Sequence, residues 1–306
     1  MTSSSAPRPA TFTNTAQPAS AGRYDFDPAQ KIRPRRRYVE WVAVPLLALF
    51  LLVLTRNLFT NPNWEWPVVW RYLFNPLVLE GIWRTIYLTL LTGVTGSLLG
   101  LTIASMRLSN SWLLRGLAVT FIGFMRSIPA LVLLLLIYFT SALFPHIGIY
   151  HPITGAAIYE LPVNDIITQF VAAWIGLTLL MGSHAGEIFR GGVMSVPAGQ
   201  IEAAKALGMP PWMTFGYVVL PQAVRVSIPA LANELINLFK NTSLVSVIGY
   251  TELLTVVQSI YGRTYQTIPL LIVACIWYLV IVIISMQGQR LLERRFSRGF
   301  GAARTA

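Results

Sequence analysis

Residues 186–222 read GEIFRGGVMSVPAGQIEAAKALGMPPWMTFGYVVLPQ. This polar stretch, punctuated by glycine and proline, lies between apolar segments that are long enough to cross a bilayer. Pro197 suits the first position of a helix, and Gly208 suits the left-handed residue just after one. The spacing predicts a helical rod over residues 197–207, about 16 Å long. This rod is too short to span a membrane and too well delimited to be a flexible linker. A second short helix is predicted near residues 212–219.

The composition is that of a membrane protein. Hydrophobic residues make up 55% of the 306 residues, charged residues only 11%, and the mean hydropathy is +0.60. A single soluble core of this length could not bury so much apolar surface, so most of it is expected to face lipid or other spans. The one cysteine, Cys275, excludes an intramolecular disulfide and is expected to be a small core residue.

Six apolar segments predict an all-α, polytopic membrane protein with six transmembrane helices. The third segment is interrupted by Arg126, Ser127 and Pro129. In the second, Gly96 and Gly100 have the GxxxG spacing that lets another helix approach closely, although glycines are also simply frequent in spans. The six segments are residues 38–59, 85–106, 116–144, 166–186, 222–241 and 267–289.

Basic residues set the predicted orientation. If the N-terminus is inside, most of the 23 Lys and Arg residues lie on the inner side, and this positive-inside bias predicts that both termini are cytoplasmic. A seventh span over residues 242–260 would place the arginine-rich C-terminus outside, so these residues are predicted to form a partly buried, non-spanning segment. The basic residues that give the net charge of +11 flank the spans rather than forming one stripe, which argues against a nucleic-acid partner. The predicted outer segments hold Arg56, Arg71, Lys240 and Arg263.

The first 37 residues differ from the rest of the chain. They are rich in Ser, Pro, Thr and Ala and end in the basic run KIRPRRR. This composition predicts a disordered cytoplasmic tail. A secretory signal is the alternative, but it would need a shorter polar leader and a small-residue cleavage site after the apolar run.

An ordered set of residues in the opening stretch resembles the EAA loop in the membrane subunits of binding-protein-dependent ABC importers. The flanking sequences GEIFRGGVMSVPAGQ and NELINLFKNTSLVSVIG are similar, more narrowly, to the polar amino-acid permeases of that group, the histidine/glutamine permease subfamily. The resemblance covers about residues 80–290. The ordered set is Glu202, Ala203, Ala204, Gly208, Leu220 and Pro221.

The resemblance implies a permease subunit in a bacterial inner membrane that moves polar amino acids. Its coupling loop, which includes Arg190 and the ordered set, would dock into a groove of an ATPase, although Glu202 alone could be a solvated helix charge. The implied partners are a cytoplasmic ABC ATPase dimer, a second permease subunit, identical or related, and a periplasmic or lipid-anchored amino-acid-binding protein. ATP and Mg would be bound by the ATPase, and no cofactor by this chain.

The implied domain organisation has a five-helix core of the type I importer class and one extra helix. It consists of the tail (1–37), an extra N-terminal transmembrane helix (38–59), a periplasmic connection (60–81), the permease core (82–290) with its cytoplasmic loop (187–221), and a C-terminal cytoplasmic tail (291–306).

The chain has no nucleotide-binding motif of its own. A P-loop needs GK followed by Ser or Thr, and none of the three lysines follows a glycine. Energy must therefore come from a partner or from an ion gradient. The alternative function is an ion-coupled secondary transporter or a channel subunit for small polar solutes, but no internal repeat is found. A membrane enzyme lacks support, because the histidines do not have a metal-ligand spacing and are expected at membrane interfaces. They are His146, His151 and His184.

Charges inside apolar segments predict a substrate path. Arg126 falls within the third segment, and a polar stripe follows the fifth at helical spacing. An amino acid carries a carboxylate and an ammonium group, which Arg126 and Glu234 could bind respectively. The alternative is a structural polar network that holds two helices together. The stripe consists of Asn233, Glu234, Asn237 and Lys240.

Overall fold

The computed structural model describes residues 38–150, residue 154 and residues 157–296. The predicted tail over residues 1–37 lies outside the described residues. Residues 297–306 of the predicted C-terminal tail lie outside them as well.

The chain divides into two compact units, residues 1–60 and residues 61–306. The described part of the first unit is α1 (Tyr38–Thr60), a helix whose large hydrophobic side chains from Trp41 to Leu54 are exposed. A helix that is apolar on all sides suits a lipid environment. Its bounds agree with the first predicted span.

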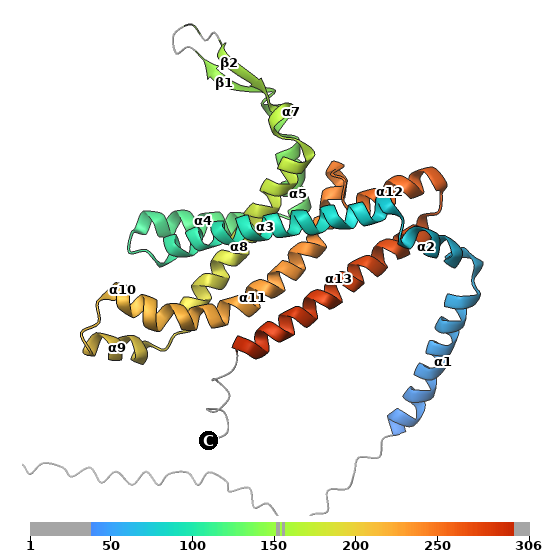
Figure 1. Ribbon diagram of the computed structural model, residues 1–306, viewed down its shortest axis with the longest axis horizontal. Coiled ribbons are helices and arrows are strands. Elements are labelled where there is room, and N and C mark those ends of the chain that lie inside the picture. Colours follow the sequence, from blue (N-terminus) through green and yellow to red (C-terminus); the bar gives the residue numbers. More distant parts are fainter. Residues whose placement is uncertain (1–37, 151–153, 155–156, 297–306) are drawn as a thin grey trace, which may run out of the picture. The chain divides into compact units, whose positions relative to one another are not determined.

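Within its described residues, the second unit is helical apart from one β-hairpin (Figure 1). Two of its short elements, η1 and η3, are 3-10 helices, and η2 is a π-helical turn. In chain order the elements are η1 (Pro62–Trp64), α2 (Trp66–Leu73), α3 (Pro76–Leu108), α4 (Trp112–Ser127), α5 (Ala130–Tyr138), α6 (Thr140–Leu143), β1 (His146–Tyr150), β2 (Ala157–Pro162), α7 (Val163–Ile166), α8 (Gln169–Met194), α9 (Ala198–Ala206), α10 (Pro211–Thr214), η2 (Phe215–Val219), α11 (Leu220–Asn241), η3 (Thr242–Ile248), α12 (Leu253–Thr264) and α13 (Thr267–Phe296).

The predicted fold class, a helical polytopic membrane protein, is confirmed. Within the described residues, five helical segments are long and apolar enough to cross a membrane, or six if the bent pair α4–α5 counts as one span. The five segments are Trp41–Thr60, Pro76–Leu108, Gln169–Met194, Pro211–Ile248 and Thr267–Phe296.

The third predicted segment is not one continuous helix. The chain bends by 101° between α4 and α5. Pro129 has no N–H for helical bonding, and it disfavours the helical conformation at Ile128, which is extended (φ −92°, ψ 131°). Hydropathy alone predicted residues 116–144 as a span, because the apolar character continues across the break.

The predicted connection over residues 60–81 is largely helical. The Asn75 side chain accepts a hydrogen bond from the Leu77 amide at 2.9 Å, and Pro76 suits a first turn, so α3 begins well before the apolar run that predicted a start at residue 85. Hydropathy placed the boundary too late, because the first turns of α3 carry charged residues.

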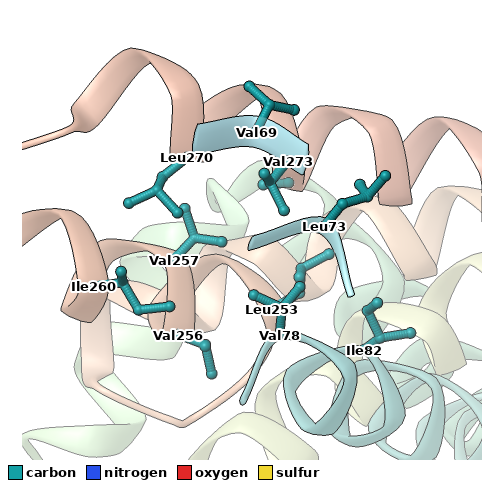
Figure 2. Packing of buried hydrophobic residues seen from close by; sticks show 11 residues of the cluster. Val69, Leu73, Val78, Ile82, Leu253, Val256, Val257, Ile260, Leu270 and Val273 are labelled. Carbon is teal, nitrogen blue, oxygen red and sulfur yellow. The ribbon is translucent and has the colours of Figure 1, made fainter. Parts of the chain in front are cut away.

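A hydrophobic cluster joins α2 to α3, α12 and α13 (Figure 2). Val69 and Leu73 of α2 pack with Val78 of α3, Val257 of α12 and Leu270 of α13, and these side chains are almost fully buried. The segment before α3 is therefore part of the folded unit. Cys275, expected in a core, is exposed on α13; this helix is so apolar that composition does not reveal its buried side.

Glycines bring α3 and α8 into close contact. A Cβ placed on Gly100 would lie 2.5 Å from the Ala185 Cβ and 2.9 Å from the Gly186 backbone nitrogen. A Cβ on Gly96 would lie 2.5 Å from Met181 Cγ. The GxxxG interpretation is therefore confirmed, and α8 is the helix that approaches.

Gly100→Ala is expected to destabilise the protein. The added methyl group overlaps backbone as well as side chain of α8, and overpacking of this kind costs about 1–3 kcal/mol. Thermal unfolding of the purified protein in detergent measures the effect. Gly123→Ala on α4 is the control, because a Cβ there meets nothing within 4 Å. Equal melting temperatures for the two variants would contradict close packing at Gly100.

Residues 242–260 do not form a spanning helix, as predicted. They comprise η3, a left-handed Gly249 (φ 76°) and the first turns of α12, which has only 12 residues. Glu252 is fully buried and caps α12, accepting hydrogen bonds from the Thr255 amide at 2.7 Å and the Tyr278 hydroxyl at 2.9 Å. This carboxylate therefore ties α12 to α13.

Glu252 should make stability depend on pH. Burial raises the pKa of its carboxyl above the ordinary 4.5, although its hydrogen bonds act in the opposite direction. The folded state then holds the proton more tightly than the unfolded state, so this contribution is present at low pH and is lost as pH rises from about 4.5 through the raised pKa. Glu252→Gln removes the titration. We expect the melting temperature of the wild type to fall relative to the variant, by about 2 °C or more, as pH increases. A pH-independent difference would contradict this assignment.

The hairpin was not predicted. Strands β1 and β2 pair antiparallel, with Ile147 opposite Leu161, and His146 lies 3.2 Å from Glu160. The hairpin precedes α7 and the start of α8, whereas α9 follows the end of α8, so the two features lie at opposite ends of this helix (Figure 1).

Candidate functional site

The rod predicted after Pro197 exists as α9. Pro197 was predicted as the first helical residue, but it lies at the N-cap with φ −59° and ψ 133°, so the helix begins one residue later, at Ala198. Gly208 has the predicted left-handed conformation (φ 74°). Its amide donates to the Lys205 carbonyl at 2.9 Å, and the Met209 amide donates to the Ala204 carbonyl at 3.1 Å. These bonds satisfy carbonyls at the helix end and turn the chain towards α10.

The faces of α9 differ in exposure. Ala204 is only 4% exposed and packs inward, whereas the side chains of Glu202 and Ala203 are exposed. Large apolar side chains flank the turn at Gly208: Leu207 is 82% exposed and Trp212 is 69% exposed. The segment thus presents a small carboxylate-bearing helix beside two uncovered hydrophobic groups.

Three residues predicted in the loop belong to the adjoining helices. Arg190 lies on α8, which continues to Met194, and Leu220 and Pro221 form the first turn of α11. The predicted helix near residues 212–219 is α10 followed by the π turn η2, which runs directly into α11. Pro221 has no N–H to donate to a preceding carbonyl, and the π turn η2 lies directly before it in this continuous helical path.

A glutamine pair fastens α9 to the start of α11. Gln222 Nε2 donates to the Gln200 side-chain oxygen at 2.5 Å and to the Val218 carbonyl at 2.8 Å. No local pattern in the sequence predicts this pair, because 22 residues separate its members.

An ion-pair cluster lies on α8 just before α9. The Glu187 carboxylate accepts hydrogen bonds from Arg190 at 2.7 and 3.0 Å and lies 3.4 Å from Arg107 Nε at the end of α3. The three side chains are only 21–27% exposed. Arg190 is therefore held by Glu187 rather than projecting freely into the loop.

The predicted substrate path is partly assembled. Glu234 on α11 lies 2.7 Å from His184 Nδ1 on α8. Asn237, one turn further along α11, is within hydrogen-bonding reach of the Glu234 carboxylate, and Arg126 lies within Coulombic range of it. Arg126 occupies the last turn of α4, where a positive charge is favourable, next to the break before α5.

The other two members of the stripe, Asn233 and Lys240, are exposed, whereas Glu234 and Asn237 are partly buried. His184 was expected at a membrane interface; it lies on α8, and its ring is a direct partner of Glu234. The only signal in the sequence was a polar residue inside an apolar segment. Within the described ranges, no group of three His, Cys, Asp or Glu residues could hold a metal ion.

Known proteins resemble the chain over most of its length. Residues 96–298 match the family described as binding-protein-dependent transport system inner membrane component. The arginine transport system permease protein ArgU of Corynebacterium glutamicum is 35% identical over 282 residues, covering 90% of this chain and 85% of that protein. The glutamine transport system permease protein GlnP of Escherichia coli is 31% identical over 234 residues, covering 76% and 98%.

A solved structure shares the fold. The crystal structure of an amino acid ABC transporter with histidines superposes with a TM-score of 0.62 and 34% identity, covering 72% of this chain and 95% of that one. These matches do not favour the secondary-transporter or channel alternative. The chain belongs to the family of binding-protein-dependent transport system inner membrane components and is a membrane-embedded permease subunit rather than a catalytic domain.

Proposed function

We propose that this chain is the permease subunit of an ABC importer that moves polar amino acids across a bacterial inner membrane. The observation that carries the proposal is α9, a short capped helix with an exposed face between two spanning helices. The relatives named as arginine and glutamine permeases support amino acids as the substrate class. ATP and Mg would be held by a separate ATPase subunit.

The proposed assembly has two permease subunits, an ATPase dimer in the cytoplasm and an extracytoplasmic amino-acid-binding protein. Both termini of this chain would be cytoplasmic, because the positive-inside bias places the basic segments there. The tail and α1 precede the part of the chain that matches the family, and we assign them to membrane anchoring or assembly.

In this proposal the residues of α9 and the following turn contact the ATPase. Exposed Glu202 offers a charge, Ala203 allows close approach, and buried Ala204 holds the helix against the permease. Closure of the ATPase dimer on ATP would move α9 and shift the permease between two conformations. Nucleotide can bias this equilibrium only because the ATPase contacts differ between the two states.

Arg126 and Glu234 would bind the substrate carboxylate and ammonium groups. The electrostatic interaction of Arg126 with Glu234 supports this role, and His184 and Asn237 would orient the Glu234 carboxylate. A purely structural network remains the competing interpretation of the same contacts. Asn233 and Lys240, which are exposed on α11, would line the route rather than hold the substrate.

Co-expression with the ATPase and binding protein from the neighbouring reading frames tests the proposal. The tagged permease is expected to capture the ATPase and, in proteoliposomes, to take up labelled arginine or glutamine only with ATP and the binding protein. Uptake that follows an ion gradient without ATP would contradict the proposal. Failure to capture any ATPase under conditions that keep the permease folded would contradict it equally.

A further inference from the structure

Polar contacts tie α3 to α8 in the middle of α3. The hydroxyl oxygens of Thr95 on α3 and Thr178 on α8 lie 2.9 Å apart, and the Trp174 indole donates to Thr95 at 3.2 Å. These side chains are partly buried. Hydroxyl and indole bonds between spanning helices oppose sliding of one helix past the other.

Glycine contacts continue this junction for two further turns towards α9. Gly182 of α8 faces Leu99, and a Cβ at Gly186 would lie 2.9 Å from Ile103 Cγ2. Glycines therefore alternate between the two helices, and each fits a side chain of the other. The approach of α11 to α8 is more localised: among the glycines of α8, only Gly192 has its nearest neighbours on α11.

The junction ends in the ion-pair cluster. Glu187 Oε1 and Arg107 Nε face each other at 3.4 Å, and both atoms are buried without a hydrogen bond to the described residues. Removal of Glu187 would leave the Arg107 charge without its partner, whereas removal of Arg107 would leave Glu187 paired with Arg190 alone. Glu187 lies one helical turn from His184, so the same stretch of α8 carries the cluster and the partner of Glu234.

We propose that Arg107 and Glu187 are positioning residues for transport, which fasten α3 to α8 so that the two helices move as one rigid body. Because α3 and α8 do not slide past each other, a displacement of α9 is transmitted along α8 to His184. The inference rests on the proposed function, since it assumes that an ATPase moves α9. It adds the path along which that movement reaches the substrate site.

A disulfide between α3 and α8 tests the rigid body. In a Cys275→Ala background, Thr95→Cys and Thr178→Cys place two thiols where hydroxyl groups now touch, and Cys275 is the only native cysteine. If α3 and α8 move together, uptake by the oxidised complex stays within twofold of uptake by the reduced complex. A loss of tenfold or more that a reductant reverses would overturn the inference.

Charge removal tests the positioning role. Glu187→Gln is expected to raise the ATP hydrolysed per amino acid taken up at least tenfold, and Arg107→Gln added to it should have little further effect. A merely structural role would lower uptake and hydrolysis together and leave the ratio unchanged, which would overturn the assignment. Glu80→Gln is the control, because Glu80 pairs with Arg84 on the exposed side of α3.

The two failures are distinguishable. A wild-type permease that captures no ATPase contradicts the proposed function itself. An intact, ATP-driven complex that the disulfide blocks, or whose coupling ratio is insensitive to Glu187→Gln, contradicts only the rigid-body inference.

Discussion

Leu207→Asp is expected to reduce capture of the ATPase by roughly 30-fold or more, while the permease itself stays folded. Leu207 caps the end of α9 and its side chain is 82% exposed, so the permease gains little from it in isolation. An exposed leucine beside exposed Trp212 is suited to a pocket on a partner, and a carboxylate there would be desolvated without a counter-charge. Capture is measured by affinity purification of the co-expressed complex.

Tyr265→Asp is the matched control. Tyr265 is also highly exposed, at 89%, but it lies between α12 and α13, away from α9. Its left-handed conformation (φ 61°) is one that aspartate tolerates, so the substitution adds a surface charge with little strain. Equal recovery of the ATPase with Leu207→Asp and Tyr265→Asp would refute docking at α9.

Glu234→Gln is expected to lower amino-acid uptake by about 10- to 100-fold without loss of ATPase capture. The amide keeps the shape of the side chain and can still bond to His184, but it loses the charge that would bind an ammonium group. Hydrogen bonds to charged groups contribute about 1.5–3 kcal/mol, which sets the expected range. Initial uptake rates in proteoliposomes at several substrate concentrations measure the effect.

The structural alternative for Glu234 makes a different prediction. If the carboxylate only holds α8 and α11 together, Glu234→Gln lowers the melting temperature and the yield of complex in proportion to uptake. Glu293→Gln provides the comparison, because Glu293 bonds only to Gln289 on the exposed surface of α13 in the structure described. Unchanged uptake in Glu234→Gln would exclude the substrate role.

Local chemistry predicted the features that depend on backbone geometry. Pro197 and Gly208 fixed the ends of α9 to within one residue, because a missing N–H and a positive φ each have few permitted positions. The spacing of Gly96 and Gly100 predicted a close helix contact for the same reason, since only a residue without Cβ permits it.

Contacts between distant residues could not be predicted in this way. His184 and Glu234 are 50 residues apart, and nothing in either segment specifies the other. The link between Arg107 and Glu187 likewise depends on how α3 packs on α8. Hydropathy also misplaced the start of α3, because the capping chemistry of Asn75 and Pro76 outweighs the charges that follow.

The bend between α4 and α5 has a consequence for the surroundings of the chain. Pro129 has no N–H to offer the Met125 carbonyl, and Ile128 has left the helical conformation. The hydrocarbon of a bilayer cannot donate a hydrogen bond to a backbone carbonyl. A span that contains this bend therefore requires a hydrogen-bond donor from outside its own backbone. Lipid tails cannot supply this donor. Water or a neighbouring polypeptide must therefore contact the bend between α4 and α5.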